Sequence, residues 1–303
     1  MFLTIFLVSV FTFCILHTLP GGTTEMVIKH VFVGLEEGVT EEMISTISER
    51  YNLEKPLYLQ YFSWITGLVT RADLGISYKY DRPVTDIILV YLPATIQLAL
   101  ASFLIVVSVG IPIGACAAFR ENRISDHLIR LLTILGVSFP SFWLGLIFII
   151  IFSLTLGLFP TSGYGTWSHL ALPALTLAVY TTSLVIRMMR TSTLETLSRP
   201  FILYATAKGL TKRTILKDHT LRNALLPIVT VLGIQFGHML AGTMIIETVF
   251  AWPGIGSLLV SSTLSRDIPL VTGLILLIIA MVLVVNLVVD IICIFVDPRI
   301  RYE

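Results

Sequence analysis

Long apolar runs separated by short polar segments dominate this sequence. Six of the runs are close to or above the ~20 apolar residues that a helix needs to cross the hydrocarbon core of a bilayer. They cover residues 1–19, 94–118, 131–157, 171–190, 224–248 and 270–296. The pattern therefore predicts an all-α, polytopic membrane protein with six transmembrane helices.

Composition supports this fold class and narrows the function. Of the 303 residues, 55% are hydrophobic and only 13% are charged, whereas soluble domains carry about 25% charged residues. The net charge of +1 gives no indication of a nucleic-acid partner. Cys14, Cys116 and Cys293 all lie inside apolar runs, so we interpret them as small buried hydrophobes and not as metal ligands or disulfide partners.

The distribution of lysine and arginine predicts the orientation, because these residues concentrate on the cytoplasmic side of membrane proteins. Thirteen of the 20 basic residues fall in three polar segments, 120–130, 187–222 and 299–301, which lie on one side of a six-span chain. Many of the acids fall between residues 36 and 54, on the other side. We therefore expect both termini to face the cytoplasm.

The polar segments also predict a division of the chain. Residues 1–19 form the first span, and the external segment 20–93 is too long for a simple connection. Amphipathic patterns after Thr40 and from Leu57 to Leu68 predict two helices there, which we interpret as an extracytoplasmic cap on the bilayer; a plain loop is the alternative. Residues 94–296 form a five-helix core with a cytoplasmic loop at 191–223, and 297–303 form a cytoplasmic tail.

Residues 199–227 form the most informative polar stretch. Pro200 suits the first turn of a helix, and Gly209 can end that helix in a left-handed conformation. Thr211 can cap a second, basic helix that leads into the fifth span. Because the stretch has no nucleophile and no ligand cluster, we interpret it as a docking surface, with small Ala205 and Ala207 permitting close approach of a partner. Ordinary cytoplasmic positive charge is the simpler alternative.

This stretch also resembles a known family. Ala207-Lys208-Gly209 followed by Leu221-Arg222-Asn223-Ala224-Leu225-Leu226-Pro227 is similar to the coupling loop of permeases of ATP-binding-cassette (ABC) importers, in the variant of the dipeptide, oligopeptide and nickel group. Further matching pieces occur in the same order along nearly the whole chain: Leu19-Pro20-Gly21, Asp73-Leu74-Gly75 with Ser77, Leu92-Pro93-Ala94-Thr95, Gly136-Val137-Ser138-Phe139-Pro140, Phe159-Pro160-Thr161-Ser162-Gly163, Phe250-Ala251-Trp252-Pro253-Gly254, and Arg266-Asp267 with Pro269. Leu203-Tyr204-Ala205 replaces the Glu-Ala-Ala triplet of the general pattern.

The resemblance implies the architecture of a type I ABC importer permease in a bacterial or archaeal plasma membrane. It implies several partners besides the lipid bilayer: a second homologous permease, two cytoplasmic ATPase subunits, and an extracytoplasmic solute-binding protein. The residues implied in coupling to the ATPases are Pro200, Tyr204, Ala205, Ala207, Lys208, Gly209 and Arg222. The sequence has no Gly-x-x-x-x-Gly-Lys-[Ser/Thr] phosphate loop, so we expect this chain to bind no cofactor and not to be an enzyme, with ATP and Mg bound by the partner subunits.

Polar residues inside the spans are candidates for the translocation path, because they are costly when they face lipid. The candidates are Gln97, Gln235, His238 and Asn286. For His238 an interhelical hydrogen bond is the alternative. We expect Asp290 to pair with a basic residue and Glu247 to tether the turn that follows it, and we expect Gly233, Gly237 and Gly242 to permit tight packing of the fifth span.

Nickel is a substrate of the group that this chain resembles, so we asked whether the sequence predicts a metal site. No two of the six histidines stand at a ligand spacing such as i, i+4, so we predict no permanent metal site. Small peptides and nickel, as ion or chelate, both remain as cargo. The rival function is a self-contained secondary transporter or channel, and an intramembrane enzyme lacks the paired nucleophile and base it would need.

Overall fold

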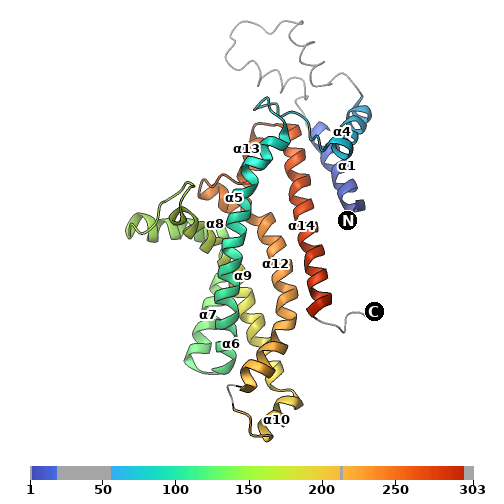
Figure 1. Ribbon diagram of the computed structural model, residues 1–303. Coiled ribbons are helices and arrows are strands. Elements are labelled where there is room, and N and C mark those ends of the chain that lie inside the picture. Colours follow the sequence, from blue (N-terminus) through green and yellow to red (C-terminus); the bar gives the residue numbers. More distant parts are fainter. Residues whose placement is uncertain (1, 19–55, 212–213, 297–303) are drawn as a thin grey trace, which may run out of the picture. The chain divides into compact units, whose positions relative to one another are not determined.

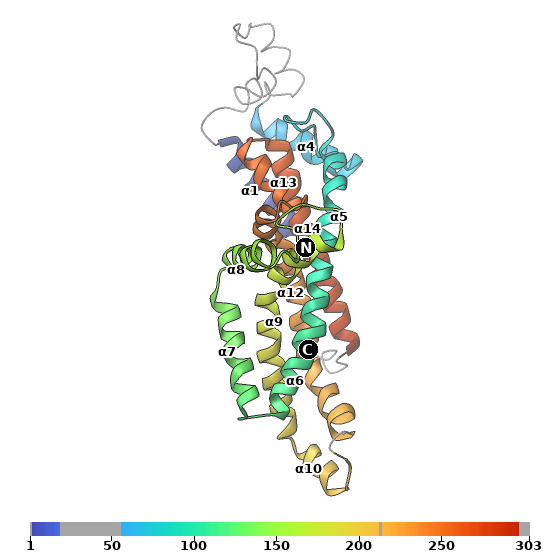
Figure 2. The ribbon, with the colours of Figure 1, turned by 90° about the vertical axis from the view of Figure 1, so that its left-hand side faces the viewer.

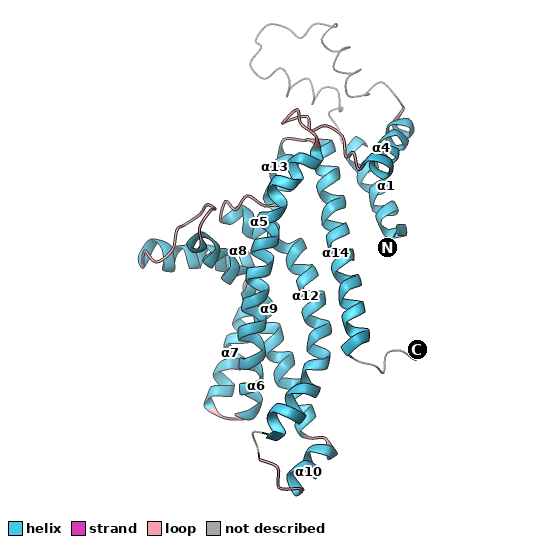
Figure 3. Ribbon diagram, in the orientation of Figure 1, coloured by secondary structure: helices cyan, strands magenta, loops and turns pink. Residues whose placement is uncertain are grey.

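The computed structural model describes residues 2–18, 56–211 and 214–296. Within these residues the regular elements are all helical, and the strand-type pairing is limited to an isolated bridge between Ile76 and Pro83 (Figure 3). The all-α prediction is confirmed. The predicted helix after Thr40 lies outside the described residues, as do Lys212 and Arg213.

Contacts along the chain group it into two compact units, and two long helices contribute to both. The first unit comprises Met1–Thr95 and Pro253–Met281, and the second comprises Ile96–Trp252 and Val282–Glu303. The elements of the first unit are α1 (Phe2–Thr18), α4 (Leu57–Arg71), α13 (Ile255–Leu264) and the first parts of α5 (Val84–Ile105) and α14 (Ile268–Val296).

The core of the first unit is an aliphatic cluster that joins α5, α13 and α14. Val84, Ile87 and Ile88 of α5 pack with residues of the other two helices, namely Ile255, Leu258, Leu270 and Leu274. The apolar pattern does not predict helix α13, because its ten residues are too few to form a span. Its first turn is fixed by Thr95, whose hydroxyl accepts a hydrogen bond of 2.7 Å from the backbone N–H of Ile255.

The second unit is built around one helix, α9 (Trp167–Leu197), which contacts α6, α7, α8 and α12. Figures 1 and 2 show α6, α7, α9 and α12 running side by side, with the short helix α10 at one end of them. The elements of this unit, besides the ends of α5 and α14, are η1 (Val106–Gly110), α6 (Ile111–Phe119), α7 (Ile124–Ser138), α8 (Ser141–Phe148), η2 (Ile149–Thr155), α9, α10 (Pro200–Ala207), η3 (Ile215–Leu221) and α12 (Arg222–Val249), where η marks a π-helical segment.

Four continuous helices among the described residues are long and apolar enough to cross a membrane: Val84–Phe119, Trp167–Leu197, Ile215–Val249 and Ile268–Phe295. A fifth span is present if α7 and α8 with η2 are counted as one broken span. The first predicted span, 1–19, corresponds to α1, a helix of 17 residues whose apolar part runs from Leu3 to Ile15. The number of six spans therefore stays a prediction, as do the cytoplasmic termini and the predicted division of the chain.

The third predicted span, 131–157, is not one continuous helix, and a single crossing by its two parts stays a prediction. The helix breaks between Ser138 and Ser141, where its two parts are bent by 108°. Pro140 causes the break, because a proline disfavours the helical conformation in the residue before it. Phe139 is accordingly extended, with φ −86° and ψ 135°.

Other helix boundaries lie beyond the predicted ones. The second span begins at Val84, well before the predicted start at residue 94, and carries Pro93 inside it. The fifth span begins at Ile215, before the predicted start at residue 224. Its helix continues through Pro227, which lies close to that predicted start. Apolar runs thus predict the middle of these helices, whereas the helices themselves begin up to ten residues earlier.

Candidate functional site

Helix α10 is the short helix predicted in the docking loop. Arg199 precedes it in an extended conformation, and Pro200 occupies its first turn. The missing N–H of proline costs nothing there, since the first N–H groups of a helix have no partner within the helix. The backbone N–H of Ile202 then donates to the Arg199 carbonyl at 3.0 Å. The predicted start of the helix is confirmed.

Gly209 ends α10 as predicted. Its φ is +78°, in the left-handed region that a glycine adopts without strain. Its N–H donates to the Thr206 carbonyl at 3.0 Å, and the N–H of Leu210 donates to the Ala205 carbonyl at 3.3 Å. These two bonds form a Schellman motif, which satisfies the carbonyls at the end of the helix. The turn is therefore a fixed element and not a loose connection.

The two faces of α10 have different roles. Ile202 and Ala205 are buried in a small cluster with Ile215, against which Leu197 packs. This corrects the expected role of Ala205, which holds α10 in place and is not available to a partner. The opposite face presents Leu203 and Tyr204, which are 75% and 64% exposed.

The remaining predicted coupling residues lie on the exposed surface. Pro200, Ala207, Lys208 and Arg222 are exposed or half-buried. The Lys208 ammonium lies 4.6 Å from the centre of the Tyr204 ring, which is cation–π geometry. After the turn, the Thr211 hydroxyl accepts a hydrogen bond of 3.3 Å from the Thr214 N–H, which is the capping role predicted for it.

An ion pair connects α7 to α9 near the end of α9 that leads into α10. Arg190 donates through Nε and Nη2 to the two carboxylate oxygens of Asp126, at 2.7 and 2.8 Å. Asp126 is fully buried, and it also accepts a bond of 3.1 Å from the Asn122 N–H. Two residues further along, the Ser192 hydroxyl donates to the Ala224 carbonyl of α12 at 2.9 Å. The last turns of α9 are thus tied to two other helices.

A groove between α12 and α14 brings together two of the four predicted path residues. His238 and Asn286 both line this groove of about 460 Å³, together with Thr230 and Asp290. Asp290 was expected to pair with a base, but it has no ion pair with any described residue. His238 likewise has no hydrogen bond to a described residue, so the interhelical alternative finds no support. Thr230 was not among the predicted path residues, and nothing in the sequence around it indicates that it lines the groove.

The other two path candidates lie elsewhere. Gln97 accepts a hydrogen bond of 3.2 Å from the Tyr164 hydroxyl, and the Tyr164 ring packs edge-on against Trp252. Gln235 is not among the residues that line the groove. Neither candidate therefore extends the polar groove beyond α12 and α14.

The three glycines of the fifth span differ in their surroundings. A Cβ at Gly233 would clash with Val289 of α14, so this glycine permits the close approach expected of it. Gly237 lies near Asn286, with room for a Cβ at van der Waals distance. No described residue of this chain lies within 4 Å of a Cβ at Gly242, so tight packing there against another helix of the chain is not found.

Two further acidic residues, Glu247 and Asp267, are buried where segments of the chain meet. Glu247 is fully buried where α12 ends, and its carbonyl accepts a bond of 2.8 Å from the Trp252 N–H across the turn. Asp267, in the first unit, is buried and binds Ser77. Both Asp267 and Ser77 belong to motifs found in the sequence, but those motifs give no sign that the two side chains meet. Among the described residues, no three His, Cys, Asp or Glu side chains gather as a metal site would require.

A short helix held on one face beside several apolar helices, with polar side chains in a groove between two of them, is the arrangement expected of the membrane component of a transporter that is driven by other subunits. Comparison with known proteins identifies the family. Residues 110–302 match the family described as the inner membrane component of binding-protein-dependent transport systems, and residues 1–99 match its N-terminal region. The chain belongs to this family and is the non-catalytic permease subunit of an ABC importer in the inner membrane, where it works with ATPase and binding-protein subunits.

Individual relatives agree with this assignment. The chain is 37% identical over 300 residues to the glutathione transport system permease protein GsiC of Escherichia coli, covering 99% of this chain and 95% of the relative. GsiC of Salmonella paratyphi A matches with the same identity and coverage. Among solved structures, a chain of the inward-facing MetNI methionine ABC transporter is similar in fold, with a TM-score of 0.60 and 19% identity over 70% of this chain and 97% of that chain.

Proposed function

We propose that this chain pairs with a second homologous permease and imports small peptides, powered by two cytoplasmic ATPase subunits and supplied by an extracytoplasmic solute-binding protein. ATP and Mg are bound by the ATPase subunits, and this chain itself binds no cofactor. Both termini face the cytoplasm in this proposal. The external cap lies within residues 20–93, whose last part from Val84 already belongs to the helix that runs to Phe119, and residues 94–296 form the core that carries the cargo.

The shape of α10 is the observation that carries the coupling role. One face is fixed against Ile215 of η3, while Tyr204 and Lys208 are exposed. A partner that holds the exposed face can therefore displace α10 only together with the helices on either side of it. Those helices are α9 and η3 with α12, so closure of the ATPases would move spans as rigid bodies.

The groove between α12 and α14 supports a translocation path for a polar solute. Polar side chains inside membrane-spanning helices are rare unless they face a cavity or another protein. His238, Asn286 and Asp290 can all exchange hydrogen bonds with a peptide backbone or its ammonium group. Release of the cargo requires weak contacts, which suits exposed side chains.

Peptides are favoured over nickel as cargo. The relatives at 37% identity are named for transport of glutathione, which is a tripeptide. Nickel, as ion or chelate, is the second candidate, and no cluster of metal ligands among the described residues favours it.

Replacing Gly209 tests the coupling role. Gly209→Val places a β-branched residue at φ +78°, which costs about 1–2 kcal/mol because the left-handed region brings its Cβ close to the carbonyl that follows. We expect ATP-driven peptide uptake by the complex in proteoliposomes to fall about tenfold, while ATP hydrolysis and the amount of complex change little. Uptake is measured with labelled di- and tripeptides in the presence of the solute-binding protein.

Gly165 supplies a matched control. It has φ +116° and open space where a Cβ would stand, but it precedes the first turn of α9, at the opposite end of that helix from α10. Gly165→Val therefore introduces backbone strain at least as large, because φ +116° lies beyond the left-handed region, and should leave uptake per ATP unchanged. Equal losses in the two variants would contradict the coupling role. Uptake by this chain without ATPases would favour a secondary transporter or channel instead.

A further inference from the structure

One buried carboxylate holds the loop between α4 and α5. Asp267, which is 1% exposed, accepts a hydrogen bond from the Ser77 hydroxyl and bonds of 3.2 Å from the backbone N–H groups of Tyr78 and Lys79. The same carboxylate accepts from the N–H of Leu270, in the first turn of α14, at 3.3 Å. The loop is therefore fastened to the start of a membrane span.

The rest of the loop is closed on itself. The Ser77 N–H donates to the Arg82 carbonyl at 2.9 Å, and the Asp81 N–H donates to the Ser77 carbonyl at 3.0 Å. Asp81 has a φ of +47°, in the left-handed region that a residue other than glycine rarely adopts. The segment 78–82 is thus a fixed turn, and it presents the side chains of Lys79, Tyr80 and Arg82 on the surface.

This turn lies on the outer side of the membrane in the proposed orientation. Only Pro83 separates it from Val84, where a continuous helical segment of 36 residues begins, and that segment ends at Phe119. Arg120 and Arg123 follow its far end, and basic residues of this kind mark the cytoplasmic side.

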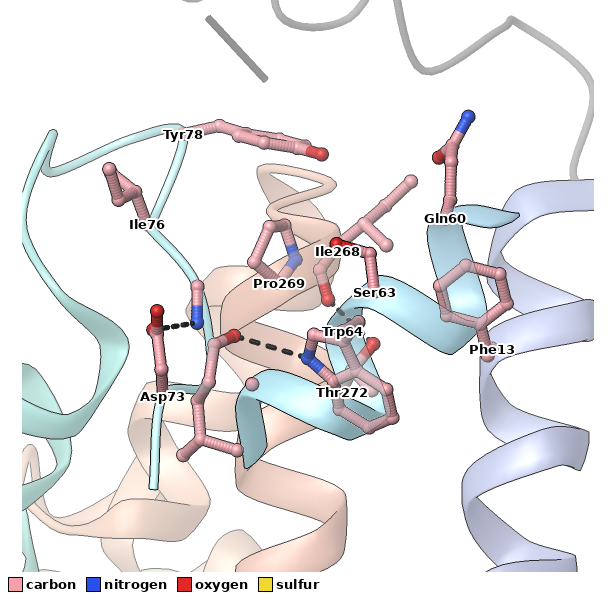
Figure 4. A pocket seen from close by; sticks show the side chains of 13 residues that line it. Phe13, Gln60, Ser63, Trp64, Asp73, Ile76, Tyr78, Ile268, Pro269 and Thr272 are labelled. Atoms are coloured by element: carbon pink, nitrogen blue, oxygen red, sulfur yellow. Dashed lines mark hydrogen bonds between the residues drawn. The ribbon is translucent and has the colours of Figure 1, made fainter. Parts of the chain in front are cut away.

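A hollow of about 290 Å³ lies beside the turn (Figure 4). Its lining includes three aromatic side chains, Phe13, Trp64 and Tyr78, together with Pro269 at the start of α14. The Trp64 indole N–H donates to the Leu74 carbonyl at 3.3 Å, which fixes the wall between α4 and the loop. Polar side chains, among them Gln60, Ser63 and Asp73, complete the lining. A hollow with an aromatic wall next to a fixed turn that carries tyrosine and arginine has the composition of a protein-binding hot spot.

We propose that the turn 78–82 and the adjoining hollow form a contact surface for the solute-binding protein. This inference rests on the proposed function, which places such a protein on the outer side. The turn would pair with acidic groups on the binding protein through Lys79 and Arg82, while the hollow would receive an apolar side chain. A lipid surface also attracts aromatic and basic residues, but contact with lipid does not require a backbone fastened by a buried carboxylate.

Titration of the assembled complex tests the surface. The permease pair and ATPases are placed in nanodiscs, and the peptide-loaded solute-binding protein encoded beside this chain is added while ATP hydrolysis is measured. The Tyr80→Ala, Arg82→Ala double variant should raise the half-saturating concentration of the binding protein at least tenfold. Ser77→Ala removes the hydrogen bond from the Ser77 hydroxyl to Asp267 and should raise the half-saturating concentration by a smaller factor.

A matched control uses the same residue types on α4. Tyr58 and Arg71 are both exposed and line neither the turn nor the hollow, so the Tyr58→Ala, Arg71→Ala variant should behave like the wild type. Unchanged half-saturation in the Tyr80, Arg82 variant would overturn the inference while leaving the proposed function intact. A loss of membrane-inserted complex at unchanged half-saturation would overturn it too and identify a lipid contact instead. A wild-type complex that no binding protein stimulates would refute the proposed function as well.

Discussion

Helices α7 and α12 both belong to the second unit and to candidate membrane spans, but they expose different side chains. The exposed residues of α7 include Leu128, Leu131, Leu132 and Leu135. The outward-facing residues of α12 include the small or polar Thr230, His238, Ala241, Gly242 and Thr248, together with two large apolar residues, Ile234 and Ile245. Because lipid tails favour large aliphatic surfaces, this difference is a reason to infer different surroundings for the two helices in the assembled transporter.

The buried faces of the two helices show the opposite difference, with polar or small residues on α7 and several aliphatic residues on α12. On α7 the buried residues are Asp126, Thr133 and Gly136, whereas leucines fill most of its exposed face between Arg130 and Ser138. On α12 the buried residues include Ile228, Leu232 and Leu240. We infer that α7 faces lipid and that the exposed stripe of α12 faces the cargo or the second permease, where polar groups have partners. Three sets of substitutions test this comparison.

Breaking the ion pair on the buried face of α7 should have the largest effect. Arg190→Met leaves the Asp126 carboxylate buried and uncompensated, which costs about 3 kcal/mol in such pairs. We expect the detergent-solubilised complex to lose thermal stability and uptake to fall with it. Melting followed by differential scanning fluorimetry measures the loss.

The chain supplies two controls for this change. Arg187, one turn earlier on α9, has no ion pair to a described residue, so Arg187→Met should have little effect on stability. The Asp126→Leu, Arg190→Met double variant should recover most of the stability, since an apolar pair can replace a buried ion pair. A double variant no more stable than Arg190→Met would contradict the assigned role of the charge.

The ion pair also shows what sequence could and could not predict. Pro200 and Gly209 were assigned correctly, because a proline at a helix start and a glycine at its end act through their own backbone. Asp126 and Arg190 stand 64 residues apart, and Ser77 and Asp267 stand 190 apart. Nothing local pairs such residues, since their meeting depends on how helices pack.

The same limit applies to the spans and the groove. Pro140 is visible in the sequence, but the apolar run continues across it, so the run alone does not predict the 108° bend. His238 and Asn286 are both identifiable as polar residues in spans, and packing alone places them in one groove. The prediction for Ala205 put it on the wrong face of α10, because alanine has no polarity that would show which face is buried.

Adding a charge to each exposed stripe should give the next largest effect. Leu132→Arg places a guanidinium on the lipid-facing side of α7, at a cost of about 2.5 kcal/mol in a membrane-spanning helix. We expect the amount of membrane-inserted protein to fall. Ile234→Arg makes the same kind of change on α12, where polar surroundings should accept the charge, so insertion should persist while peptide uptake is lost.

Immunoblots of membrane fractions and uptake assays separate these outcomes. The comparison predicts opposite patterns, with loss of protein for Leu132→Arg and loss of transport by intact protein for Ile234→Arg. Equal loss of inserted protein in both variants would show that α12 also faces lipid. Normal uptake by Ile234→Arg would place the path away from this stripe.

The smallest effect should come from two glycines of α12 that lie on different faces. A Cβ at Gly233 would come closer to Val289 than real side chains allow, whereas a Cβ at Gly242 meets nothing within 4 Å. Gly233→Ala should therefore lower stability by about 1–2 kcal/mol through overpacking. Gly242→Ala should raise it by about 0.5 kcal/mol, because alanine loses less backbone entropy in a helix.

The sign of the Gly242 change sharpens the comparison of α7 and α12 further. If the exposed stripe lines an open path, alanine fits there and both stability and uptake persist. If the second permease packs closely against Gly242, alanine lowers the melting temperature of the assembled complex, as it does at Gly233. Melting of the complex together with uptake thus distinguishes a path-lining face from a subunit contact. A loss of stability at Gly242 with no loss at Gly233 would contradict the packing of α12 against Val289 of α14.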